Sequence, residues 1–141
     1  MANSKIPFTL TTPLGSVFQG EVDEITLTTK EGEITILPHH IPLVSLLEVG
    51  HIRVKEGEEE HYFAIDGGIV DVRHDGSVVV LSQRSENARE IDIERAERAM
   101  ERAKEYVSGE GKKEAKEYRR LQYILKKEEN RIRVAKKGHR K

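Results

Sequence analysis

The stretch GEITILPHHIPLVSLLEVG, residues 32–50, contains two short apolar runs separated by a loop that proline bounds on both sides. Residues 32–37 and 43–47 are rich in Ile, Leu and Val and have the length of β-strands. Proline cannot donate a hydrogen bond to a sheet, so Pro38 and Pro42 mark the edges of these strands. The stretch therefore predicts two strands joined by a shaped contact loop.

The same pattern continues on both sides of this stretch. Short runs rich in Val, Ile and Thr alternate with Gly, Pro or Asp-Gly turns, and one expected turn covers residues 55–57. The further expected strands are 8–12, 15–19, 22–29, 51–55, 61–65, 68–73 and 77–81. No helix-length segment lies between them to carry a parallel crossover. The pattern predicts an all-β sandwich, or flattened antiparallel barrel, of about eight to ten strands.

After residue 87 the apolar period becomes helical. Asp92 is placed to cap a helix that ends at Gly109, where we expect glycine to adopt the left-handed conformation. A second helix is expected over 112–137, with a seam that Glu128 interrupts. The seam residues are Tyr118, Leu121, Leu125, Ile132 and Ala135. The sequence predicts an antiparallel α-helical hairpin, with a domain division into residues 1–87 and 88–141.

The two parts carry opposite charges. Residues 1–86 contain 6 basic and 14 acidic residues, whereas residues 87–141 contain 18 basic and 11 acidic residues. This asymmetry favours docking of one part on the other, or a basic arm directed at an acidic partner. The beginning of the chain does not have the pattern of a signal peptide, and no apolar run is long enough to span a bilayer.

No pattern typical of an enzyme is present. The chain has no cysteine, no Ser-His-Asp spacing, no Gly-rich phosphate loop and no cofactor fingerprint. His39 and His40 are adjacent on a loop, which makes a poor chelate, and the acidic run 56–60 is most simply a solvated hairpin turn. The sequence therefore predicts a protein that binds partners, with no catalytic residues and no metal site.

Three segments together resemble a known family. The pattern G-E-x-x-x-x-P-x-H-x-P begins at Gly32, IDGGIVDV covers residues 65–72, and EIDIERAERAMERAKE covers residues 90–105. In this order, followed by a helical hairpin, they resemble the epsilon subunit of bacterial F-type ATP synthases over nearly the whole chain. The resemblance implies a non-catalytic subunit of the central stalk, peripheral to the cytoplasmic face of the cell membrane and attached to the membrane only through the complex.

The resemblance also implies partners. The sandwich would contact the gamma subunit and the ring of c subunits, and so pass ion-driven rotation to the catalytic head. The implied contact residues are Glu31, Glu33, Pro38, His39, His40 and Pro42. The hairpin would fold on the sandwich or extend to the catalytic beta and alpha subunits, where it blocks ATP hydrolysis. The 13 basic against 4 acidic residues from Gly111 onward fit such an acidic partner.

Family members often hold the folded hairpin closed with one regulatory ATP, although no cofactor is required. The implied ATP-binding residues are Glu86, Asp92, Arg95, Ala96, Arg102, Lys127 and Arg131. Lysine at 127 keeps the charge of the family's arginine but loses its bidentate fork. Two alternatives remain open: a stand-alone nucleotide sensor and a basic-tailed nucleic-acid binder. Against nucleic acid stand the acidic sandwich and the lack of an aromatic stacking platform on the basic helix.

Overall fold

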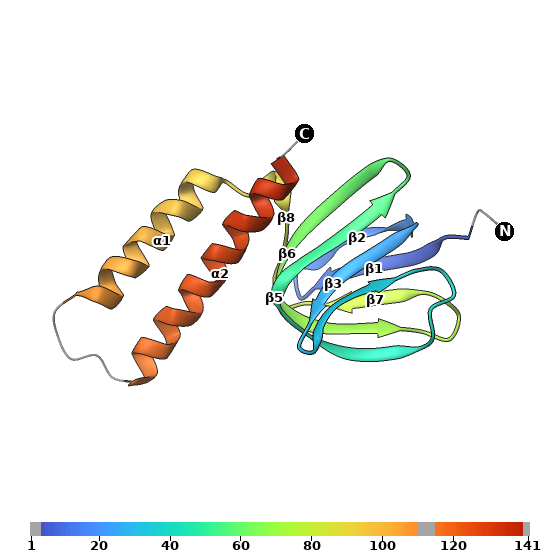
Figure 1. The fold of residues 1–141 in the computed structure, drawn as a ribbon, viewed down its shortest axis with the longest axis horizontal. Helices are drawn as coiled ribbons and strands as arrows, with labels where there is room; N and C mark the ends of the chain where they lie inside the picture. The colour runs from blue at the N-terminus through green and yellow to red at the C-terminus, as the bar shows by residue number, and fades with distance from the viewer. Residues whose placement is uncertain (1–3, 110–114, 140–141) are drawn as a thin grey trace.

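The computed structural model describes residues 4–109 and 115–139, which form a β-sandwich followed by two α-helices (Figure 1). This confirms the predicted fold class. The strands are β1 (Ile6–Thr12), β2 (Gly15–Val22), β3 (Glu24–Thr29), β4 (Gly32–Ile36), β5 (Leu43–Glu56), β6 (Glu59–Val72), β7 (Val78–Leu81) and β8 (Ser85–Asn87).

Hydrogen bonds connect all eight strands into one folded sheet with the order β2-β1-β7-β6-β5-β3-β4, and β8 pairs with β6. One pair departs from the expected antiparallel arrangement, because β1 runs parallel to β7 with Phe8 opposite Val78. Parallel neighbours need a long connection, and the chain from β2 to β6 supplies it. This parallel pair joins β1 and β2 to the rest of the sheet.

Strands β5 and β6 are longer than expected. Each has 14 residues, where the sequence predicts two separate strands, and they stay paired from Leu43 opposite Val72 to Glu56 opposite Glu59. Gly67 and Gly68 lie inside β6 with φ of 94° and 140°, a region that side chains rarely adopt. These glycines bend the strand without ending it, so the prediction of strand ends there is wrong. One hairpin therefore contributes to both layers.

The core of the sandwich comes from alternate residues of the strands. Phe8 and Phe63 are among its largest fully buried side chains, and Phe18 packs against the cluster from β2. The other buried members are Ile6, Leu10, Val22, Ile25, Leu27, Ile36, Leu47, Ile52, Val54, Ile65, Val70, Val72, Val78 and Val80. This core consists of large aliphatic and aromatic side chains, so it supplies most of the hydrophobic stabilisation of the chain.

The helices follow a short 3-10 helix, η1 (Ala88–Glu90). Helix α1 (Ile93–Ser108) begins as expected, because the side chain of Asp92 accepts a hydrogen bond of 3.1 Å from the backbone N–H of Arg95. Gly109 has φ −65° and ψ 154°, so the expected left-handed cap is wrong. Helix α2 (Ala115–His139) ends two residues later than expected, and the expected start of this helix at residue 112 lies outside the described residues.

Helix α2 lies between α1 and the sandwich (Figure 1). Contacts join α2 to α1 on one side and to β5, β6 and η1 on the other. None of the described helices is long and apolar enough to cross a membrane. The arrangement makes α2 the element through which the helical hairpin meets the sandwich.

Candidate functional site

The face of the sandwich that meets α2 has a small apolar contact. Its side chains are mostly short, and they form a cluster separate from the sandwich core. The members are Ala64, Ala88, Ile91, Val134 and Ala135. Gly138 allows α2 to approach η1 closely, because a Cβ at that position would overlap the methyl group of Ala88. Since the cluster buries little area, apolar packing alone holds α2 only weakly.

Asn130 forms a buried polar contact across this interface. Its side chain is 4% exposed, and its Nδ2 donates a hydrogen bond of 2.8 Å to the carbonyl oxygen of Gly50 on β5. A buried carbonyl that loses its donor costs about 1–3 kcal/mol. Asn130 therefore fixes the position of α2 along β5.

Arg131 makes the strongest ion pair between α2 and the sandwich. Its Nε and Nη2 donate hydrogen bonds of 2.7 and 2.9 Å to the two carboxylate oxygens of Glu86 on β8, and its Nη1 donates one of 2.8 Å to Glu128. Burial works to lower the pKa of Arg131, but the two carboxylates outweigh it and raise that pKa above its ordinary value. Arg131 is thus held fully charged in a bidentate pair.

Lys127 extends the same row of contacts by one helical turn. Its Nζ lies 3.3 Å from Oδ2 of Asp66 on β6 and 5.4 Å from the ring centre of Tyr123. The Asp66 side chain is only 10% exposed. We call Lys127, Asn130 and Arg131, with their partners Asp66, Glu86, Glu128 and the Gly50 carbonyl, the polar latch. It provides the specific contacts that the small apolar cluster lacks.

His51 lies beside the polar latch on β5. Its side chain is 18% exposed, and its Nε2 is 3.5 Å from a carboxylate oxygen of Glu33. Burial lowers the pKa of His51, and the positive charges of Lys137 and Arg133 on α2 add to the effect, against the opposing influence of Glu33. The docked hairpin therefore favours a neutral imidazole at this position.

Two family models together match almost the whole chain. The model of the ATP synthase delta/epsilon chain β-sandwich domain matches residues 5–88, and that of the long α-helix domain matches residues 89–136. The chain belongs to the ATP synthase delta/epsilon family. This membership confirms the resemblance seen in the sequence.

Named relatives in the delta/epsilon family cover most of the chain. The ATP synthase epsilon chain of Halalkalibacterium halodurans is 42% identical over 124 residues, which is 88% of this chain and 92% of the relative. That of Alkalihalophilus pseudofirmus is 46% identical over 100 residues, 71% of this chain and 74% of the relative. Both relatives are aligned over more than two thirds of their own length.

Solved structures show the same fold. A chain of the Euglena gracilis mitochondrial ATP synthase complex of OSCP, F1 and c-ring matches with a TM-score of 0.79 and 26% identity, over 91% of this chain and 79% of that chain. A chain of the Tetrahymena thermophila central stalk and c-ring matches with a TM-score of 0.57 and 18% identity, over 97% and 98%. The second likeness concerns the fold alone.

The structure separates the basic ATP-binding residues that the family resemblance implies into two groups. Glu86, Lys127 and Arg131 lie together in the polar latch, where both cations face carboxylates of the sandwich. Asp92 caps α1, and the neighbouring Ala96 is buried. The first group forms part of the docking interface whether or not a nucleotide binds.

Arg95 and Arg102 form the second group, on the exposed surface of α1. Neither side chain forms a hydrogen bond or ion pair with any residue of 4–109 or 115–139. Arg102 lines an open hollow of about 650 Å³ together with Arg98 and three glutamates, Glu94, Glu97 and Glu101. The described residues that line this hollow are thus three acidic and two basic ones, and their net charge is negative.

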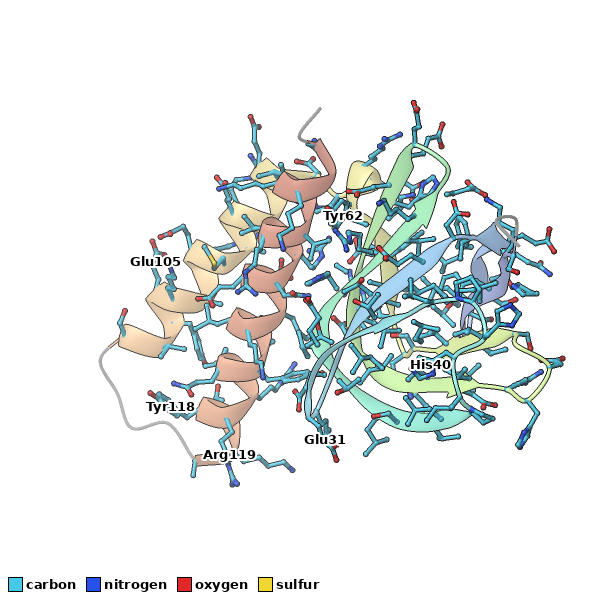
Figure 2. All side chains as sticks on the ribbon, turned by 45° about the vertical axis from the view of Figure 1, so that its right-hand side comes forward. Glu31, His40, Tyr62, Glu105, Tyr118 and Arg119 are labelled. Carbon is cyan, nitrogen blue, oxygen red and sulfur yellow. The ribbon has the colours of Figure 1, made fainter. Side chains whose placement is uncertain are left out.

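The implied contact residues lie at opposite ends of β4. Glu31 lies in the turn before β4 and Glu33 near the start of β4, whereas Pro38, His39, His40 and Pro42 follow the strand. Figure 2 shows Glu31 and His40 well apart along the sandwich. His39 has a positive φ of 68° and its Nε2 lies 3.2 Å from Oγ of Ser4. The two groups thus lie on two separate parts of the sandwich.

Three members of the polar latch, Asp66, Glu128 and Asn130, are not among the site residues that the sequence predicts. Asn130 is a lone amide in an otherwise charged stretch, and Asp66 precedes a glycine pair. Glu128 interrupts the expected seam of α2, and the structure gives the reason, because it pairs with Arg131 three residues later. A carboxylate at a position where a helical seam expects an apolar residue is a signal that points to such a contact, whereas Asn130 lies outside the expected seam and carries no such signal.

Replacing Arg131 with Met should loosen the hairpin, because Glu86 would lose its bidentate partner at the interface. We expect the free energy for local opening of α2 to fall by about 2–3 kcal/mol, which is of the order of a 100-fold rise in amide exchange. Hydrogen exchange followed by mass spectrometry measures this. Arg120→Met, an exposed charge removal on the same helix, should leave exchange unchanged. Equal exchange in both variants would contradict the role of the polar latch.

Docking of α2 should weaken on acidification. His51 has a lowered pKa in the docked state. Below pH 6.5, the ordinary pKa of histidine, this imidazole therefore takes up a proton readily only in the undocked or unfolded state. The contribution of His51 to the free energy of unfolding is therefore fully present above about pH 6.5 and is lost as the pH falls below it. Urea unfolding at pH 7.5 and 5.5 should show a smaller decline in His51→Gln than in the unmodified chain or in His74→Gln, a change at an exposed turn. An equal decline in all three would exclude His51 as the cause.

Proposed function

We propose that this chain is a non-catalytic subunit of the central stalk of an F-type ATP synthase, which transmits rotation of the c-ring to the catalytic head through the gamma subunit. Family membership over residues 5–136 supports this proposal, as does the name shared by the relatives, ATP synthase epsilon chain. The chain would associate with the membrane only through the complex, on its cytoplasmic face.

The hairpin is the regulatory part in this proposal. The contrast between two interfaces carries the argument: large aliphatic and aromatic residues form the sandwich core, whereas α2 rests on a few small residues and the polar latch. Water can replace each hydrogen bond of the polar latch when α2 leaves, so undocking costs far less than unfolding the sandwich. An extended hairpin would present the basic surface of α2 to the catalytic subunits and block ATP hydrolysis.

A regulatory ATP fits the same element. Lys127 and Arg131 supply two cations on the side of α2 that meets the sandwich. Arg95 and Arg102 supply two more on α1. Because Glu86 and Asp66 already neutralise the first pair, phosphates must compete with carboxylates for them. Binding without hydrolysis is expected, since the chain has no Gly-rich phosphate loop.

Co-purification with the gamma subunit tests the stalk role. The tagged chain should retain co-expressed gamma through size-exclusion chromatography. Absence of a complex with gamma would overturn the proposal. Retention on heparin that falls steeply with salt, without gamma binding, would instead favour the nucleic-acid alternative.

Calorimetric titration with ATP, with and without magnesium, tests the regulatory nucleotide. Saturable binding is expected, and Arg95→Ala and Arg102→Ala should each weaken it by about 1.5–3 kcal/mol, the range of a charge-assisted hydrogen bond. Arg98→Ala, an equivalent change on α1, serves as the control and should have a smaller effect. If no binding occurs at millimolar ATP, contacts with partner subunits alone would determine whether the hairpin is docked or extended.

A further inference from the structure

Three metal-ligating side chains, none of them a member of the polar latch, meet at the tip of the β5–β6 hairpin. Glu56 pairs directly with Glu59 across the hairpin, and His61 pairs with Val54. Side chains two residues apart on a strand share a face, so Glu56, Glu59 and His61 project to the same side of the sheet. Gly57 and Glu58 form a two-residue loop with Gly57 at φ 64°, which fixes this register.

The spacing of these groups matches the coordination shell of zinc. Nε2 of His61 lies 3.3 Å from Oε1 of Glu56 and 3.7 Å from Oε2 of Glu59, and all three ligand atoms lie within 4.8 Å of one another. A tetrahedral Zn²⁺ with bonds of about 2.0–2.1 Å has ligand atoms about 3.3–3.4 Å apart. Only small side-chain adjustments would bring the three donors to that distance.

Packing holds the imidazole and the hairpin tip in place. The Phe18 ring centre lies 5.4 Å from that of His61, and Phe18 in turn contacts Phe8 and Phe63 of the core. Oδ2 of Asp23 accepts a hydrogen bond of 2.7 Å from the backbone N–H of Gly57, which ties the tip to the sandwich. The donors are therefore positioned before an ion arrives, which lowers the cost of binding.

The charges at the tip also favour a cation. Two glutamates directly opposite each other on neighbouring strands repel, and no lysine or arginine of the described residues pairs with either of them. The His61 side chain is 19% exposed and that of Glu59 is 70% exposed, so one side of the group is shielded and the other is open to solvent. This geometry suits three protein ligands with water in the fourth position.

We propose that Glu56, Glu59 and His61 bind a divalent metal ion of the zinc class and thereby join the ends of β5 and β6. The site lies on the sandwich, so the proposal is independent of the stalk function and of the regulatory nucleotide. It replaces the sequence-based expectation that no metal site is present and that the acidic run is only a solvated turn.

Titration of the full chain with Zn²⁺, followed by calorimetry and by the thermal unfolding midpoint, tests the proposal. We expect one saturable site and a raised midpoint, because the ion binds the folded hairpin and not the unfolded chain. His61→Gln and Glu56→Gln should each weaken binding by more than about tenfold, the lower bound for losing even an outer-shell partner. Both variants should keep the circular dichroism spectrum of the fold.

Glu60→Gln is the matched control, because it removes the same charge one residue from the site on the opposite face of β6. It should bind Zn²⁺ as the unmodified chain does. His74→Gln controls for a histidine elsewhere on the surface. Absence of saturable Zn²⁺ binding, or equal affinity in His61→Gln and Glu60→Gln, would overturn the proposal.

Discussion

The bidentate ion pair between Arg131 of α2 and Glu86 of β8 is the contact on which the arrangement of the two parts depends. It joins residues 45 positions apart, and it lies beside the buried hydrogen bond from Asn130 to Gly50. Both contacts are directional, so they set where α2 lies on the sandwich, whereas the small apolar cluster around Ala64 only permits close approach. Here basic side chains of α2 pair with acidic side chains of the sandwich, in agreement with the opposite charges of the two parts of the sequence. A partner with better placed carboxylates would compete for the same arginine and lysine.

The two parts of this small chain are stabilised by different kinds of contact. The sandwich is closed by the parallel pairing of β1 with β7 and by the two long strands that serve both layers. Its core therefore unfolds only with the whole sheet. The hairpin depends on contacts that water can replace, and the lowered pKa of His51, next to cationic residues of α2, predicts that docking weakens in acid. The proposed function needs both properties, because the sandwich would carry torque and the hairpin would change state.

Much of the fold follows from local sequence signals, and the failures have physical causes. Alternating apolar residues and Pro or Gly turns predict the strands, and Asp92 predicts the start of α1. The sequence predicts separate strands over 61–65 and 68–73, yet Gly67 and Gly68, with positive φ values, lie within one continuous β6. The family resemblance pointed to Glu86, Lys127 and Arg131, but pairing of Arg131 with Glu86 depends on tertiary placement that no local pattern encodes. The turn expected at 55–57 lies at residues 57 and 58, and the register of this hairpin decides which glutamates face His61.

Pulsed electron paramagnetic resonance between spin labels tests the central claim, that the polar latch holds the hairpin on the sandwich. Because the chain has no cysteine, the substitutions Gln19→Cys on β2 and Arg120→Cys on α2, both at exposed positions, create two labelling sites and no others. The account predicts one narrow distance distribution in this background. It predicts a second, longer and broader population when Asn130→Ala and Arg131→Met are added. A single unchanged distribution in both proteins would contradict it.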